Sequence, residues 1–136
     1  MSIFQKKSAA PPAARPTESE LEILQVLWET GPATVRAIND RLNERREVGY
    51  TTTLKLLQIM FDKGLVARSE DARTHLYAAG VDESATKGVL LRQFVDTAFR
   101  GSAMQLVMQA LGNHEATPSE LDEIKALIQQ LEQQQP

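Results

Sequence analysis

Hydrophobic residues recur at intervals of three and four in three stretches of the first half of the chain, which is the spacing of an amphipathic helix. The first stretch follows Thr17 and ends before Gly31, the second follows Thr34, and the third runs from about Tyr50 to Lys63. The pattern therefore predicts three short helices. Their apolar faces comprise Leu21, Leu24, Leu27, Trp28, Val35, Ile38, Leu42, Thr53, Leu56, Leu57, Met60 and Phe61.

Beyond Gly64, a typical helix-ending residue, the spacing changes. Residues 65–68 and 74–77 predict two short strands, and the polar stretch 69–73 between them predicts the turn of a hairpin. Helical spacing then returns for the rest of the chain. The expected helices run from near Asp82 to Gly101, over 103–111 before Gly112, and from Pro118 onward.

Three S/T-x-x-E/Q sequences stand where helical spacing begins, at Thr17–Glu20, Ser102–Gln105 and Thr117–Glu120. In such a capping box the hydroxyl accepts from a free amide of the first turn, and the Glu or Gln side chain accepts from the amide of the cap residue. These sequences predict where three of the helices begin.

Three short helices followed by a hairpin within about 65 residues indicate a winged helix-turn-helix. We therefore predict a mainly α protein with a disordered tail over 1–16, a winged-helix DNA-binding domain over 17–80 and a helical dimerisation domain over 81–136. In this arrangement the helix over 50–63 enters the major groove, and the hairpin flanks it as a wing over the DNA backbone.

If Leu57 and Met60 face inward, the helical period turns the opposite side of that helix outward. Thr hydroxyls and Lys suit phosphates and base edges, the Thr and Ile methyl groups suit thymine methyls, and wing arginines suit phosphate or a narrow minor groove. For each residue alone the alternative is an ordinary solvated side chain. The predicted DNA-binding residues are Tyr50, Thr51, Thr52, Lys55, Gln58, Ile59, Arg68, Arg73, His75 and Arg46.

The second half of the chain has apolar helix faces that about fifty residues can hardly bury alone. A single small winged helix also makes few DNA contacts, so such domains usually bind as dimers. The alternative is that these faces pack on the chain's own domain. The predicted dimerisation residues are Leu91, Phe94, Val95, Phe99, Leu106, Leu121, Ile124, Leu127, Ile128 and Leu131.

The net charge of −3 conceals an asymmetry between the two halves. Residues 1–80 hold eleven Lys and Arg against ten Asp and Glu, whereas residues 81–136 hold four against eight. The first half therefore has a net charge of +1 and the second half a net charge of −4. The first half can therefore face a polyanion, whereas the acidic second half is suited to a different role.

The chain contains no cysteine and only two histidines, His75 and His114. This excludes disulfides, thiolate nucleophiles and cysteine-type zinc sites, and it fits a cytoplasmic protein. His114 with Glu115 and Ser119 lies at an expected turn, where lone polar residues are usually solvated caps. We expect no catalytic residue, no metal and no cofactor, and therefore no enzyme.

The apolar runs are too short to span a membrane, so we expect the protein not to lie in one itself. The N-terminal stretch has Lys6 and Lys7 followed by Ala and Pro, without the apolar segment of a signal peptide.

Several stretches resemble the penicillinase and methicillin-resistance repressors and their copper-responsive relatives. They are 20–28, the Val-Gly-Tyr-Thr-Thr-Thr sequence at 48–53, the Lys-Gly-Leu-Val sequence at 63–66 and the Arg-Thr-His-Leu-Tyr sequence at 73–77. The resemblance continues through Phe99-Arg100-Gly101 to the last helix. It implies a dimeric DNA-binding repressor that acts on dyads of TACA/TGTA type.

In antibiotic-responsive members of that family, a membrane-embedded sensor metalloprotease leads to cleavage of the repressor at an Asn-Phe pair in the dimerisation domain. This chain departs from that pair, with Gln109 and Ala110 at the corresponding place, and these two residues are the candidate cleavage site if the route operates. The absence of cysteine removes the copper-sensing cluster of the copper-responsive members. Leu54 and Ile59 stand where some members have Arg, so we expect a different operator.

The sequence therefore predicts a homodimeric transcriptional repressor of a palindromic operator, released by a signal-dependent event such as proteolysis in the dimerisation domain. Its expected partners are operator DNA, a second copy of the chain and a membrane sensor protease. The alternative is a winged-helix adaptor that binds another protein and not DNA.

Overall fold

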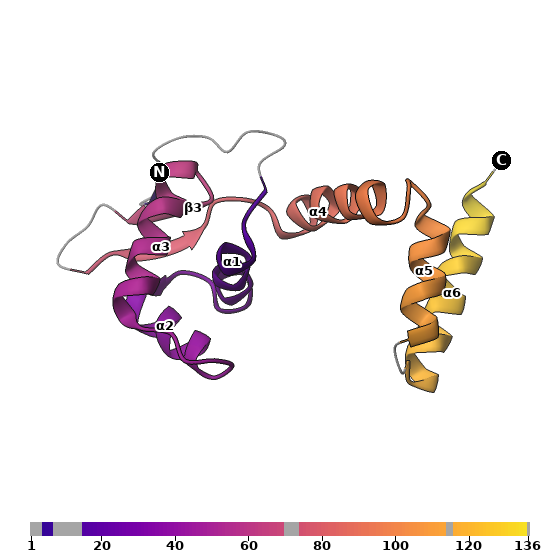
Figure 1. Ribbon diagram of the computed structural model, residues 1–136, viewed down its shortest axis with the longest axis horizontal. Coiled ribbons are helices and arrows are strands. Elements are labelled where there is room, and N and C mark those ends of the chain that lie inside the picture. Colours follow the sequence, from indigo (N-terminus) through magenta and orange to yellow (C-terminus); the bar gives the residue numbers. More distant parts are fainter. Residues whose placement is uncertain (1–3, 7–14, 70–73, 114–115, 136) are drawn as a thin grey trace. The chain divides into compact units, whose positions relative to one another are not determined.

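The computed structural model describes residues 4–6, 15–69, 74–113 and 116–135 (Figure 1). The helices are α1 (Glu18–Thr30), α2 (Val35–Asn43), α3 (Tyr50–Lys63), α4 (Glu83–Ala98), α5 (Ala103–Asn113) and α6 (Pro118–Gln134). The strands are β1 (Phe4–Gln5), β2 (Ala33–Thr34), β3 (Val66–Ser69) and β4 (Leu76–Ala79). The predicted fold class, mainly α with a winged helix-turn-helix followed by helices, is confirmed.

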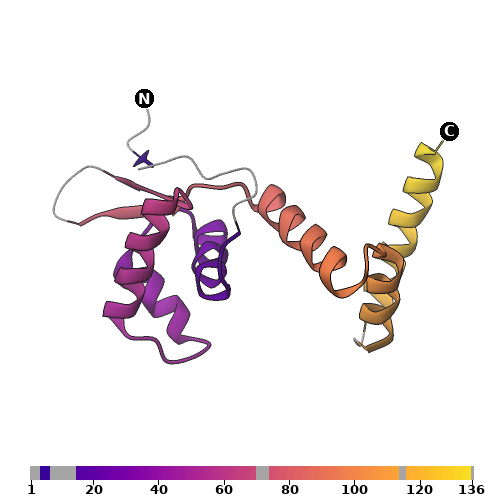
Figure 2. The same cartoon turned by 45° about the horizontal axis from the view of Figure 1, so that its top comes forward.

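Helices α1, α2 and α3 lie on one side of the strands, as Figure 2 shows. Their apolar faces meet each other and the inner side of the hairpin β3–β4. Tyr77 of β4 is almost completely buried among them. The apolar spacing of the sequence thus corresponds to one core. Its buried members are Ile23, Leu24, Val26, Leu27, Val35, Ile38, Leu42, Val48, Leu57, Met60, Leu65, Val66 and Tyr77.

The sheet has the strand order β1-β3-β4-β2, and all neighbours in it are antiparallel. The central hairpin aligns Val66 with Ala79 and Arg68 with Tyr77. The wing, defined here as β3, β4 and the connection between them, was expected with strands over 65–68 and 74–77. In the structure β3 lies one residue later and β4 two residues later than expected.

Strand β1 departs from the expectation that residues 1–16 form a disordered tail. Phe4 pairs with Ser69 and Gln5 with Arg68, so this segment extends the sheet beyond β3. The physical reason is that β3 offers backbone donors and acceptors on the edge that faces away from β4. Composition alone does not reveal such a partner when it lies more than sixty residues away.

The predicted capping boxes at Thr17 and Thr117 are both confirmed, with each hydroxyl and each Glu side chain bonded as expected. At Ser102 the hydroxyl accepts from the amide of Gln105 at 3.1 Å. Gly64 ends α3 in the left-handed conformation with φ of 81°, as its position in the sequence suggested.

The prediction that Gly112 ends the fifth helix is wrong, because α5 continues to Asn113. A glycine inside a helix is unfavourable by about 1 kcal/mol relative to alanine, which is too little to end it on its own. The glycine that does break a helix pattern in this half is Gly101, which has φ of 82° and follows Arg100 with φ of 52°.

The chain divides into two compact units, Met1–Leu91 and Arg92–Pro136. The division falls inside α4, later than the boundary expected between residues 80 and 81. The segment after β4 packs on the first unit, since the indole N–H of Trp28 donates to the carbonyl of Val81 at 3.1 Å and Thr86 is buried. These contacts assign the first turns of α4 to the first unit.

The second unit contains the end of α4 together with α5 and α6. Phe94 and Phe99 meet edge to face, with ring centroids 5.7 Å apart. Among the described residues of α5 and α6 none is buried. The second unit therefore lacks the kind of core that the first unit has.

Candidate nucleic-acid interface

The reading face is defined here as Thr51, Thr52, Lys55, Gln58 and Ile59, on the side of α3 away from the core. All five are exposed, as the helical period predicted. Ile59 is an exposed large apolar side chain at 38%. The reading face is held in place because the opposite side of α3, with Thr53, Leu57 and Met60, is buried.

The connection between α2 and α3 is fixed by two asparagines that sequence reasoning did not single out. Asn39 Nδ2 donates to the Val48 carbonyl at 3.0 Å and to Thr53 Oγ1 at 2.8 Å. Asn43 Nδ2 donates to the same carbonyl at 2.8 Å, and its Oδ1 accepts from the Val48 amide at 3.1 Å. These bonds set where α3 begins. A polar residue inside an apolar helix pattern, Asn39, was the available signal.

The other end of α3 is tied to α1 by an ion pair. Lys63 Nζ lies 2.8 Å from Glu20 Oε2, and Glu20 is only 1% exposed although it is a carboxylate. Burial raises the pKa of Glu20, but hydrogen bonds from Lys63 and Thr17 and the charge of Lys63 outweigh it, so that the pKa lies below its ordinary value. The carboxylate is therefore ionised at neutral pH and joins the two helices.

The wing does not present its predicted residues equally. The Arg68 guanidinium lies over the Phe61 ring at 4.0 Å from its centroid, and Arg68 is half-buried. His75 is exposed, and its Nδ1 lies 2.8 Å from the Ser69 carbonyl oxygen. Arg73 is outside the described residues. Arg68 thus has a packing role on α3 that its position in the sequence did not indicate.

Arg46, predicted to contact DNA, faces an acid of α1. Its Nη2 lies 2.7 Å from Glu22 Oε1, and its Nε donates to Glu22 Oε2 at 3.3 Å. The hydrogen bond from Arg46 lowers the pKa of Glu22, and the same bond raises the pKa of Arg46. A DNA phosphate would have to compete with this carboxylate for the guanidinium.

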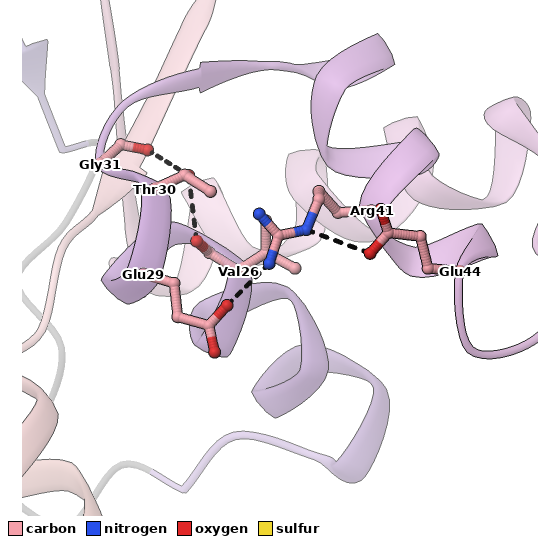
Figure 3. Close-up of polar contacts among 6 residues, drawn as sticks. All are labelled: Val26, Glu29, Thr30, Gly31, Arg41 and Glu44. Atoms are coloured by element: carbon pink, nitrogen blue, oxygen red, sulfur yellow. Dashed lines mark hydrogen bonds and ion pairs between the residues drawn. The ribbon is translucent and has the colours of Figure 1, made fainter.

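Arg41 is engaged in a similar way, as Figure 3 shows. It lies between two carboxylates, with Nη2 at 2.8 Å from Glu29 and Nε at 3.4 Å from Glu44. Beside it, the Thr30 hydroxyl donates to the Val26 carbonyl at 3.0 Å near the end of α1. By contrast, Lys55 on the reading face takes part in none of the ion pairs found in the described part of the chain.

Arg36 in the first turn of α2 is a further exposed cation that the sequence reasoning missed. Its guanidinium lies 5.9 Å from the centre of the Tyr50 ring, at the start of α3. A hollow of about 450 Å³ separates these residues from the wing, and its lining includes Leu54, Thr74 and His75. The signal for Arg36 in the sequence was its position two residues after the cap residue Thr34. Leu54, which together with Ile59 was expected to change the operator, is half-buried against the core.

In the second unit, five of the nine predicted dimerisation residues are exposed. Val95 is the least exposed of the nine, at 8%, and packs within its own chain. Leu91, also exposed, belongs to the first unit. Phe99, Leu106 and Ile124 are half-buried. The exposed members of the second unit are Phe94, Leu121, Leu127, Ile128 and Leu131.

Helix α5 adds exposed apolar side chains that were not predicted. Met104, Val107, Met108 and Leu111 recur at three- and four-residue spacing and are all exposed. That spacing was visible in the sequence. Gln109 and Ala110, the candidate cleavage site, are exposed on the same helix. The apolar surface of the second unit is defined here as the nine exposed residues Phe94, Met104, Val107, Met108, Leu111, Leu121, Leu127, Ile128 and Leu131.

No helix in the described parts of the chain is both long enough and apolar enough to cross a membrane. Likewise, no group of three or more His, Cys, Asp or Glu side chains gathers as a metal site within residues 4–6, 15–69, 74–113 and 116–135. His114 and Glu115 lie outside these ranges.

The sequence pattern of the penicillinase repressor family matches residues 16–130. This match includes all three helices of the core, the wing and most of the second unit. The chain belongs to the penicillinase repressor family. It is therefore a member of a family of DNA-binding transcriptional repressors and not of enzymes, which agrees with the prediction from its motifs.

Individual relatives agree with this assignment. The transcriptional regulator BlaI of Mycobacterium tuberculosis strain H37Rv is 34% identical over 102 residues, which cover 71% of this chain and 74% of that protein. The methicillin resistance regulatory protein MecI of Staphylococcus aureus strain N315 is 20% identical over 82% of this chain and 91% of its own length. The penicillinase repressor of Bacillus licheniformis is 20% identical over 84% of this chain and 89% of its own length.

Proposed function

We propose that the protein is a homodimeric transcriptional repressor in the cytoplasm that binds a palindromic operator through its first unit and pairs through its second. The observation that carries this proposal is the reading face. Five exposed side chains that suit base edges and phosphates stand on a helix whose other side is fixed in a closed core. Such a rigid placement is what base recognition in the major groove requires.

Within this proposal the residues divide into two groups by the part of DNA they contact. Thr51, Thr52, Gln58 and Ile59 contact base edges and thymine methyls, and Lys55 contacts a guanine edge or a phosphate. The flanking groups contact the backbone. They are Arg36, Tyr50, Arg68, Arg73, His75 and Arg46, the last after it leaves Glu22.

The pairing of two copies follows from the apolar surface of the second unit. Side chains such as Phe94 and Met108 are 55% and 69% exposed, which is unfavourable for a lone chain in water. A second copy that covers them also brings a second reading helix to the same operator. Two half-sites bound together give the affinity that one small winged helix does not reach.

The test is a titration of the full chain onto promoter DNA from its own gene, followed by fluorescence anisotropy at several salt concentrations. We expect sequence-dependent binding that weakens steeply as salt rises, because counterions are released from phosphates. Lys55→Ala should weaken binding and reduce the salt slope by about one unit if Lys55 contacts a phosphate. Lys125→Ala, which removes an exposed lysine from α6, is the matched control and should change neither quantity.

Binding that is independent of both sequence and salt would overturn the repressor proposal. A chain that stays monomeric in sedimentation and ignores DNA would favour the adaptor alternative instead. Equal effects of Lys55→Ala and Lys125→Ala would place the DNA contacts outside the reading face.

Release of the repressor is proposed to follow cleavage between Gln109 and Ala110, downstream of a membrane sensor protease. Both residues are exposed, and a cut inside α5 would divide the apolar surface of the second unit. The measurement is sequencing of fragments from cells challenged with a cell-wall antibiotic. A fragment that begins at Ala110 supports this route, and an intact chain in induced cells overturns it.

A further inference from the structure

Strand β1 comes from a part of the chain that the family pattern does not include. The family match begins at residue 16, whereas β1 consists of Phe4 and Gln5. These two residues nevertheless join the sheet of the winged helix. The contact therefore adds an element of this chain's own to a wing that the family pattern already contains.

The position of β1 in the sheet determines what it changes. The hairpin β3–β4 has β2 on its outer side at β4 and β1 on its outer side at β3. Without β1 the strand β3 would be an edge strand with unpaired N–H and C=O groups along one side. With β1 in place, both sides of the hairpin have a neighbouring strand.

The pairing leads directly to the exposed residues of the wing. Phe4 lies opposite Ser69, and Ser69 is itself bonded across the hairpin. Its hydroxyl accepts from the Leu76 amide at 2.9 Å, and its carbonyl oxygen lies 2.8 Å from His75 Nδ1. Ser69, which is buried, thus connects β1 to His75, the exposed residue of the wing.

A second contact lies at the base of the hairpin. Lys6 Nζ donates to the Gly80 carbonyl at 3.1 Å, and the Gly80 amide donates to the Leu65 carbonyl at 2.8 Å. The approach is close, because a Cβ at Gly80 would lie 3.0 Å from Lys6 Cδ and 2.9 Å from the Gly64 carbonyl oxygen. A side chain at Gly80 would collide first with the backbone of Gly64 and Leu65, so this position suits glycine, and Lys6 packs directly beside it.

We propose that residues 4–6 are a positioning segment for the wing, which pairs with β3 through Phe4 and Gln5 and holds the exit of β4 through Lys6. By restricting the motion of the hairpin, the segment lowers the entropy lost when the wing settles on DNA. The part of this proposal that concerns DNA rests on the proposed repressor function. The part that concerns the sheet does not.

The strand contact is tested first, without DNA, by hydrogen exchange in the full chain. Gln5→Pro removes the backbone N–H and fixes φ, which is poorly compatible with a paired strand. Gln5→Ala keeps the N–H and leaves φ free. We expect faster exchange in the peptide that covers 66–69 for Gln5→Pro and unchanged exchange for Gln5→Ala. Equal exchange in the two variants overturns the proposal.

The consequence for DNA is tested by operator titration of the same variants. Gln5→Pro leaves the charge unchanged, so we expect affinity to fall about threefold to tenfold, the effect of roughly one hydrogen bond, with an unchanged salt slope. Lys6→Met should have a similar effect, and Lys6→Arg, which keeps a donor, should restore affinity. A reduced salt slope in Lys6→Met would overturn positioning in favour of a direct phosphate contact.

Failure of the proposed repressor function and failure of the proposed role of residues 4–6 give different results. If the unaltered chain binds no operator while Gln5→Pro still accelerates exchange over 66–69, the repressor function is overturned and the strand contact is supported. If exchange changes while operator affinity stays the same in Gln5→Pro, the positioning role is overturned and the repressor function is unaffected.

Discussion

The two units of the chain use similar apolar residues in opposite ways. In the first unit side chains such as Ile23, Leu57 and Tyr77 are buried within the chain itself. In the second unit Leu127, Ile128 and Leu131 have the same helical spacing but are about half-exposed. The first unit therefore covers its apolar residues within a single copy, whereas the second leaves apolar area exposed.

Charge differs between the units in the same sense. Met1–Leu91 holds twelve Lys and Arg against twelve Asp and Glu, a net charge of 0, and Arg92–Pro136 holds three against six, a net charge of −3. An acidic second half avoids phosphates, and a near-neutral first half can approach them where its cations are free of carboxylates. The difference between the units is thus one of both packing and electrostatics.

The largest expected effect separates the two kinds of apolar residue. Leu57→Ala opens a cavity in the core of the first unit and should lower the free energy of unfolding by about 2–5 kcal/mol. The measurement is urea denaturation followed by circular dichroism. Leu127→Ala at protein concentrations low enough to give a monomer is the control, and it should change stability by less than about 1 kcal/mol. Comparable losses in the two variants would show that the second unit has a core of its own.

The next effect concerns association and DNA together. Leu127→Asp combined with Leu131→Asp places two charges on the apolar surface of the second unit and should give a monomer with operator affinity reduced on the order of 100-fold. Sedimentation and anisotropy measure the two quantities. Gln129→Asp with Gln133→Asp adds the same charge on the other side of α6 and is the matched control. A double variant that still sediments as a dimer would place the interface elsewhere.

A smaller effect depends on pH and is confined to the first unit. The folded pKa of Glu20 lies below its ordinary value of 4.5, so its contribution to stability is present above pH about 5 and is lost as pH falls through the folded pKa. Glu20→Gln should cost about 1–2 kcal/mol at pH 7, since it weakens both the cap and the pair with the half-exposed Lys63. The difference in the free energy of unfolding between Glu20→Gln and the unaltered chain, measured by urea denaturation, should shrink toward pH 3. A difference independent of pH would rule out the ionised carboxylate as its cause.

The smallest effect is expected at the surface of the first unit. Arg41→Ala removes two exposed ion pairs and should lower stability by no more than about 1 kcal/mol, with less effect at high salt. Thermal denaturation at two salt concentrations measures it. A larger loss would mean that the pairs with Glu29 and Glu44 hold α1 and α2 together more tightly than their exposure indicates.

Local patterns in the sequence were sufficient for the helices and for the reading face. Apolar spacing located the three core helices, the caps at Thr17 and Thr117 located two helix starts, and the period of α3 turned Lys55 and Gln58 outward. Each of these features depends on residues within a few positions of each other, where spacing and hydrogen-bond chemistry act directly.

The features that the sequence did not reveal depend on residues far apart in the chain. Phe4 meets Ser69 across more than sixty residues, and Asn39 bonds Thr53 across fourteen. The stacking of Arg68 on Phe61 likewise follows from how β3 leaves α3. Residue type does not tell an arginine that binds DNA from one that packs on a ring, because both uses need the same planar cation.

Thr34 belongs to two structures at once. Its backbone pairs with Leu76 of the wing, while its hydroxyl accepts from the Ala37 amide and caps α2. A displacement of β4 is therefore passed to the first turn of α2 through a single residue, without a flexible connection between them. Strand β4 is thus joined to the start of the helix-turn-helix through the backbone and the hydroxyl of one threonine.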